Sequence, residues 1–75
     1  MKKANFVSTR CYEQAGKAYE QLLVDGVVVT EWNILTEMVF DSLWDLLESM
    51  GYDTSDVADV DFCPYAIGYY EKYAA

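Results

Sequence analysis

The amino-acid sequence predicts a mainly α-helical fold: a small bundle of two longer amphipathic helices, a short acidic turn and a C-terminal helix. Two segments, residues 9–24 and 30–50, carry apolar side chains every three to four positions, which places these side chains on one face of a helix. Capping residues and glycines stand at the ends of both segments. Because 75 residues supply only one core, we expect a single domain over residues 1–75.

The first predicted helix covers residues 9–24. Ser8 or Thr9 suits its N-cap, and Gly26 follows its last turn as a C-terminal signal. Its apolar stripe consists of Cys11, Tyr12, Ala15, Ala18, Tyr19, Leu22 and Leu23.

An α+β fold with a small hairpin around residues 18–30 is the alternative. Asp25 and Gly26 form a pair that favours a type I′ turn between β-prone residues. We prefer the helix, because a period of 3.6 residues fits the whole stretch from Tyr12 to Leu23, whereas a period of two fits only parts of it. The valines at 27–29 then become a short extended connector.

The second predicted helix begins at Thr30, a good N-cap, and ends at Met50 before Gly51. Its core stripe is formed by Leu35, Val39, Leu43, Leu46, Leu47 and Met50. An acidic turn with a short piece of helix through residues 57–60 follows. Pro64 fits the first turn of the C-terminal helix. The broad aromatic face of that helix comprises Tyr65, Tyr69, Tyr70 and Tyr73.

The charge is strongly negative and unevenly distributed. Lys and Arg number 5 and Asp and Glu 13, which gives a net charge of −8. Residues 1–17 carry four basic residues against one acid, or +3, while residues 18–75 carry twelve acids against Lys72 alone, or −11. Such an excess of negative charge favours solubility or the binding of a basic partner. It also disfavours direct binding of nucleic acid, which needs a basic surface.

Catalysis and bound cofactors are not expected. The sequence has no His, no Gly-rich phosphate loop and no G-x-S-x-G elbow. Cys11 and Cys63 lack both a CxxC spacing and His partners, so a zinc site has too few ligands. The aspartates of residues 53–61 do not follow the order of a calcium-binding EF-hand loop. We therefore expect neither an enzyme nor a metalloprotein.

A cytoplasmic location with reduced thiols is the expectation for this chain. Lys2 and Lys3 are not followed by an apolar signal-peptide core, and no apolar run approaches the length that spans a bilayer. A disulfide between Cys11 and Cys63 is the alternative.

The predicted binding surface is a ridge of carboxylates on the second helix. Four of them fall within an arc of about 80° on the helical wheel, nearly opposite the core stripe. The ridge consists of Glu37, Asp41, Asp45 and Glu48, and Glu31 extends it at one end. A second acidic row follows at Asp53, Asp56, Asp59 and Asp61. Because no basic residue lies between these acids, the ridge favours a partner with a basic groove. The alternative is that the ridge is only a solvated surface.

Two apolar side chains on the same wheel are candidate anchors beside the ridge. Trp44 lies at the border of the acidic arc and Ile34 within it. An apolar anchor adds affinity where charge adds mainly association rate and orientation. The alternative is that another segment covers Trp44.

In size, acidity and lack of catalytic motifs, the chain resembles the small inhibitors that phages carry against host defence, the anti-CRISPR and anti-restriction proteins, several of which imitate DNA. The resemblance covers the whole chain by type and rests on no shared motif. It implies an inhibitor in the host-cell cytoplasm that occupies the basic nucleic-acid channel of a nuclease or surveillance complex.

The runner-up function is a protein-interaction module, such as a regulatory or antitoxin-like subunit. It would bind through Trp44 and the tyrosine-rich face, with charge only at the rim. A homodimer that forms through the tyrosine-rich face is a further alternative.

Overall fold

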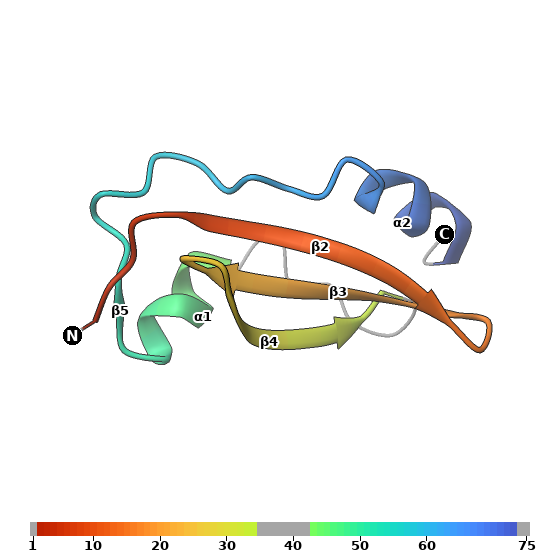
Figure 1. Ribbon diagram of the computed structural model, residues 1–75, viewed down its shortest axis with the longest axis horizontal. Coiled ribbons are helices and arrows are strands. Elements are labelled where there is room, and N and C mark those ends of the chain that lie inside the picture. Colours follow the sequence, from red (N-terminus) through yellow and green to blue (C-terminus); the bar gives the residue numbers. More distant parts are fainter. Residues whose placement is uncertain (1, 35–42, 74–75) are drawn as a thin grey trace.

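The computed structural model describes residues 2–34 and 43–73. In this part, the chain forms a three-stranded antiparallel sheet, a two-stranded parallel sheet and two short helices (Figure 1). The elements are, in order, β1 (Lys2–Lys3), β2 (Val7–Gln14), β3 (Lys17–Val24), β4 (Val27–Asn33), α1 (Leu43–Ser49), β5 (Tyr52–Asp53) and α2 (Ala66–Tyr73). The fold is therefore mostly β, and the predicted helical bundle was wrong.

Residues 9–24, predicted as the first helix, instead form most of β2 and all of β3, which continue into β4 as a meander joined by two-residue turns. Ala15 and Gly16 connect Gln14 to Lys17, with φ angles of 53° and 76°. The next turn, at residues 25–26, has φ angles of 51° and 84°. Two consecutive positive φ angles define the type I′ turn, whose twist matches that of the flanking strands. The hairpin considered as the alternative is thus only half of a larger sheet.

The burial pattern along β3 shows that residues 17–24 follow the two-residue period of a strand. Ala18, Glu20, Leu22 and Val24 are buried, and these alternate residues share one face of the sheet. Ala18 and Leu22 also fit the predicted helical stripe, because both periods coincide over a few residues. The presence of a buried Glu20 between apolar neighbours is the feature that separates the two interpretations.

Replacing Ala15 with Asn should stabilise the protein by about 0.5–1 kcal/mol, because Ala is strained at positive φ and Asn tolerates this conformation. Chemical denaturation measures the change. Exchanging Ala18, which is buried in the adjacent strand, for Asn is the control and should destabilise the fold. A neutral or destabilising Ala15→Asn would contradict the type I′ assignment.

The second predicted helix, over residues 30–50, was also wrong in its first turn. Thr30 does not cap a helix but lies in β4 opposite Leu22. The reason is the run of β-branched residues at 27–30, which favours a strand over a helix. The described helix α1 covers Leu43–Ser49, and residues 35–42 lie outside the described part of the chain.

The main core lies between one face of the three-stranded sheet and α1. Leu43 and Leu47 from α1 pack with a cluster of buried strand and N-terminal residues. That cluster consists of Ala4, Val7, Leu22, Val24 and Trp32. Burial of each large aliphatic side chain contributes about 1.5–3 kcal/mol.

The segment from β5 to α2 runs back along the free side of β2, as Figure 1 shows. Asp61 forms a parallel bridge with Ser8, and its backbone N–H donates to the carbonyl of Val7 at 2.9 Å. The N–H of Thr9 in turn donates to the carbonyl of Asp61 at 3.0 Å. The short helix expected at residues 57–60 is therefore absent, and this stretch is extended. The C-terminal helix that was expected after Pro64 is present as α2.

Candidate interaction surface

Helix α2 is held on the sheet by a buried chain of polar side chains. Glu20 on β3 is fully buried, and the hydroxyl of Tyr70 donates to its Oε1 at 2.8 Å. The indole Nε1 of Trp32 on β4 donates to the same hydroxyl oxygen at 2.9 Å. Burial raises the pKa of Tyr70. The hydrogen bond from Trp32 lowers this pKa, and the carboxylate of Glu20 raises it further. The Tyr70 hydroxyl thus links α2 to both β3 and β4.

The two cysteines lie at the edge of this polar chain. Cys11 on β2 is opposite Glu20 in the register of the sheet. The backbone N–H of Cys63 donates to Oγ1 of Thr9 at 2.9 Å, which places Cys63 above the same face of β2. Burial, together with a hydrogen bond to the Cys63 thiol and the charge of Glu20, raises the pKa of Cys11 to about 12. Both cysteines are half-buried thiols.

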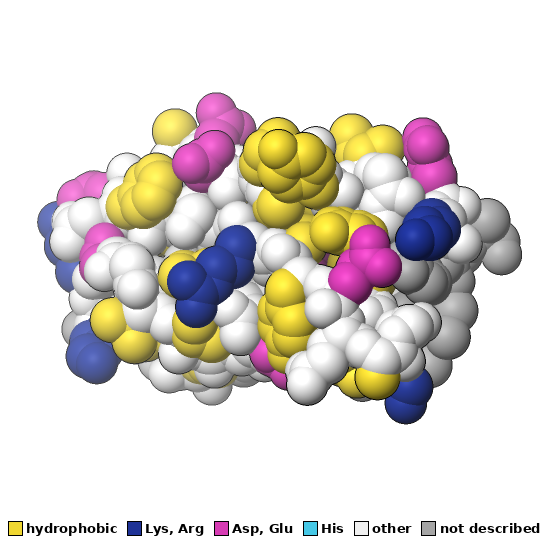
Figure 2. Space-filling model, turned by 45° about the vertical axis from the view of Figure 1, so that its right-hand side comes forward, with side chains coloured by type: hydrophobic (Ala, Val, Ile, Leu, Met, Phe, Trp, Pro, Cys, Tyr) yellow, Lys and Arg dark blue, Asp and Glu magenta, His cyan; other side chains and the backbone are white. Residues whose placement is uncertain are grey.

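Large apolar side chains are exposed just before and within the first turn of α2. Phe62 is 42% exposed, Tyr65 71% and Ile67 72%. Phe62 and Ile67 also line a surface pocket of about 430 Å³, together with Cys63, Pro64 and Ala66. Residues 62–67 are named the apolar patch from here on. Figure 2, in which the α2 end of the molecule is turned toward the viewer, shows hydrophobic side chains at the surface with acidic ones beside them.

Carboxylates stand on both sides of the apolar patch in the sequence. Asp59 and Asp61 precede it, and Glu71 follows Ile67 by four residues, one turn along α2. All three acids are exposed. The nearest cation in sequence, Lys72, lies 3.6 Å from a carboxylate oxygen of Glu13, so its charge is partly offset. The charged residues that flank the patch in the sequence are therefore mainly acidic.

Glu31 does not belong to the helix that carries the described members of the predicted acidic ridge. Asp45 and Glu48 are exposed on α1, but Glu31 lies on β4. There Oε1 of Glu31 accepts hydrogen bonds from the Tyr12 hydroxyl at 2.8 Å and from Gln21 at 2.9 Å. The two remaining members, Glu37 and Asp41, lie outside the described residues. The correction follows from the strand at residues 27–33, which separates Glu31 from α1.

One of the two predicted anchors is not available to a partner. Ile34 is fully buried, and its backbone N–H donates to the carbonyl of Ala18 at 2.9 Å. Its position at the end of β4 turns it into the core, so its prediction as an anchor was wrong. Trp44 is 39% exposed on α1, as an anchor requires.

The second acidic row is partly engaged in the fold. Oδ1 of Asp53 accepts from the backbone N–H of Ser55 at 3.0 Å, and Asp56 pairs with Nζ of Lys3 at 2.6 Å. Both members of this ion pair are more than half exposed, so it contributes little stability. Asp59 and Asp61 are exposed and stand nearest to the apolar patch. Only these two extend the negative surface beside the patch.

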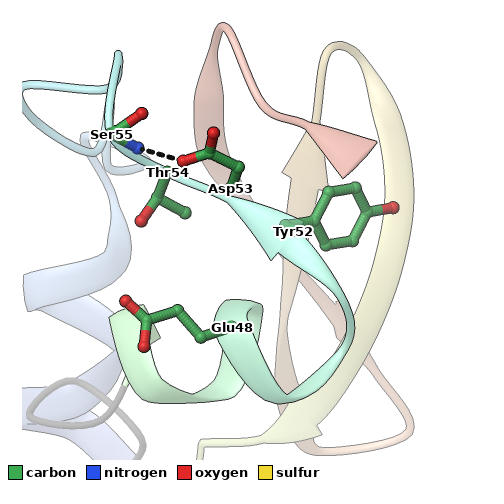
Figure 3. Close-up of a pocket in the computed structure, with 5 residues that line it drawn as sticks. All are labelled: Glu48, Tyr52, Asp53, Thr54 and Ser55. Carbon is green, nitrogen blue, oxygen red and sulfur yellow. Dashed lines mark hydrogen bonds between the residues drawn. The ribbon is translucent and has the colours of Figure 1, made fainter. Parts of the chain in front are cut away.

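A second pocket, of about 350 Å³, is lined by Glu48, Tyr52, Asp53, Thr54 and Ser55. Figure 3 shows the carboxylate of Asp53 turned toward Ser55 and that of Glu48 on the other side of the pocket. The two carboxylates do not converge on a common point, which an acid–base pair or a cation would need. Within residues 2–34 and 43–73, no group of three or more acidic or Cys side chains could hold a metal ion.

The Asp53 turn gives a pH prediction. The backbone N–H and then the side chain of Ser55 lower the pKa of Asp53 below its ordinary value of 3.8. A lowered pKa in the folded state means that this stabilisation is complete above pH 3.8 and is lost as the pH falls through the lower value. NMR titration of the carboxyl carbon should have its midpoint below 3.8, and Ser55→Ala should raise it. A wild-type midpoint at 3.8 or above would contradict the turn geometry.

Comparison with known proteins adds no function to this geometry. No family model, curated protein or solved structure matches the chain. Of the helices that the structure describes, neither has the length and hydrophobicity to cross a membrane.

The sequence analysis missed the residues that now form the most exposed apolar surface. Phe62 and Ile67 were not singled out, and Tyr65 was considered only as part of the tyrosine-rich face of the runner-up function. An available signal was the apolar run from Phe62 to Ile67 around Pro64, directly after two aspartates and with no charge of its own. The role of Glu20 was also missed, because a helix placed it on the solvent side.

Proposed function

We propose that the protein is a non-catalytic binding protein that holds a basic surface of a partner protein against its apolar patch. The observation that carries this proposal is the exposure of Tyr65 and Ile67 beside a surface pocket, with carboxylates on either side. Exposed apolar surface of this kind, surrounded by polar groups, is typical of interaction sites.

The arrangement matches the usual anatomy of a protein interface. Such interfaces have an apolar, aromatic centre that supplies most of the affinity and a polar rim. Tyr65 and Ile67 could each bury most of their side chain against a partner, and burial of a large apolar side chain contributes about 1.5–3 kcal/mol. The pocket, which Phe62 and Ile67 line, can receive an apolar side chain of the partner.

The charge defines the class of partner. Asp59, Asp61 and Glu71 would form the rim, within a protein whose net charge is −8. Complementary charge raises the association rate and orients the two surfaces. A basic surface on the partner therefore fits the patch, and the nucleic-acid-binding face of a nuclease or surveillance complex is one surface with this character.

The structure gives less support to imitation of a nucleic-acid backbone. Helix α1 is seven residues long and carries two carboxylates, Asp45 and Glu48. Over its length of about 10 Å, one DNA strand carries roughly three phosphates. In the 53–61 row, two of the four aspartates already have partners within the chain. We therefore assign the specific contact to the apolar patch and a supporting role to the charge.

Site-specific crosslinking tests the proposal. A photoreactive amino acid at position 67 should capture a partner from lysate of the source cell. The same group at position 27 is the matched control, because Val27 is also apolar and 65% exposed but lies at the end of the sheet away from α2 (Figure 1). The captured protein is then purified and titrated against the unlabelled chain at increasing salt.

The proposal expects a basic protein captured from position 67 and not from 27, with an affinity that falls but persists as salt screens the rim. Equal capture from both positions, or a purified partner that does not bind, would contradict it. Competition by free DNA would identify the partner surface as a nucleic-acid channel.

A further inference from the structure

The two cysteines are brought together by the packing of the 61–63 segment on β2. They are 52 positions apart in the sequence. Cys63 is tied through its backbone N–H to Thr9, and Cys11 follows Thr9 by two residues on the same face of β2. The Cys63 thiol is also one of the groups that raise the pKa of Cys11, in keeping with this placement. Cys63 belongs to the apolar patch, but the pairing of the two thiols does not depend on the binding of a partner.

The two thiols differ in access to solvent-borne reagents. Cys63 lines the surface pocket of the apolar patch. Cys11 does not line this pocket but lies opposite Glu20 in the sheet, and partial burial keeps it protonated by raising its pKa to about 12. Since the thiolate is the nucleophile in thiol–disulfide exchange, a reagent in the pocket reacts first with Cys63.

We propose that Cys11 and Cys63 form a redox pair that low-molecular-weight disulfides, such as glutathione disulfide, oxidise to an intramolecular disulfide. In the first step, the Cys63 thiolate attacks one sulfur of the reagent, forming a mixed disulfide and releasing one thiolate, which takes up a proton. In the second, the Cys11 thiol loses its proton and attacks the sulfur of Cys63, releasing the second reagent thiol. Two protein thiols and one disulfide thus give one protein disulfide and two small thiols.

The disulfide would link the segment before α2 covalently to β2. A disulfide that closes a loop of this length restricts the unfolded chain strongly. The melting temperature of the oxidised protein should therefore rise by on the order of 10 °C, and a dithiol reductant should reverse the rise.

Intact mass and peptide mapping test the pair. The reduced protein is incubated with glutathione disulfide, the remaining thiols are blocked, and the unfolded chain is digested with trypsin. Cleavage after Arg10, Lys17 and Lys72 separates Cys11, in peptide 11–17, from Cys63, in peptide 18–72. The inference expects a mass lower by two hydrogen atoms and a covalent link between these two peptides.

Two variants test the order of the steps. Cys11→Ser should stop at the mixed disulfide, with glutathione retained on Cys63. Cys63→Ser should react much more slowly, because only the buried Cys11 remains. Peptides that stay unlinked in the wild type, or disulfides that form only between molecules, would overturn the proposal. So would equally fast modification of the two variants.

Discussion

Replacing Tyr70 with Phe should destabilise the protein by about 2–4 kcal/mol, although it removes a single oxygen atom. The hydroxyl of Tyr70 accepts from Trp32 and donates to Glu20, so its loss leaves two buried polar groups without that partner. Each buried group left unsatisfied costs about 1–3 kcal/mol. In a domain of this size, the melting temperature should fall by roughly 10–20 °C. Thermal and chemical denaturation both measure the change.

The control for this variant is Tyr65→Phe, on the exposed side of the same region. Tyr65 is 71% exposed, so its hydroxyl is solvated, and the substitution should change stability by less than about 0.5 kcal/mol. If both variants were equally stable, the polar chain between α2 and the sheet would have no energetic role, and the position of the apolar patch would need another explanation.

Replacing Ile67 with Asp should weaken binding of the partner by at least about tenfold while leaving the fold intact. The side chain is 72% exposed, so the substitution removes little from the core. In the complex, however, a carboxylate would be buried in the apolar centre, where desolvation of a charge is costly. The dissociation constant is measured with the purified partner, and circular dichroism verifies the fold.

The matched control is Val27→Asp, which adds the same charge at a similarly exposed apolar position outside the patch. It should leave the affinity within about twofold, because only the net charge changes. An equal loss from both variants would assign the effect to charge alone and would contradict a specific role of the patch.

Some properties of the protein could be predicted from the sequence because they depend on composition. The net charge, the lack of a catalytic motif and the weak case for a metal site follow from residue counts and spacing. The C-terminal helix was also predictable, since Pro64 sets its beginning and no competing strand pattern follows.

The sheet was not predicted, because residues 9–24 satisfy two periods at once. Leu22 and Leu23 fit a helical stripe, yet only alternate residues of β3 share a face with Glu20. Two signals were available: Ala15-Gly16 and Asp25-Gly26 are separated by eight residues, the length of one strand between two tight turns. Weighing Asp25-Gly26 alone gave a single hairpin, and the first turn was overlooked because Ala is unusual at positive φ.

The error in secondary structure also moved the predicted site. Glu31 and Ile34 were placed beside Asp45 and Glu48 by a helix that the structure replaces with a strand. The apolar patch could not be derived from a helical wheel, because exposure of Ile67 depends on how Tyr70 fixes α2 on Glu20. That contact joins residues 50 positions apart.

The most direct test of the binding surface is a map of amide chemical-shift changes in the isotope-labelled protein on addition of the captured partner. The proposed function predicts that the largest changes lie in residues 59–71, with small changes at Val27 and on the open sheet face around Tyr12 and Glu31. Changes concentrated on α1, at Asp45 and Glu48, or on the open sheet face would contradict it and place the binding surface there.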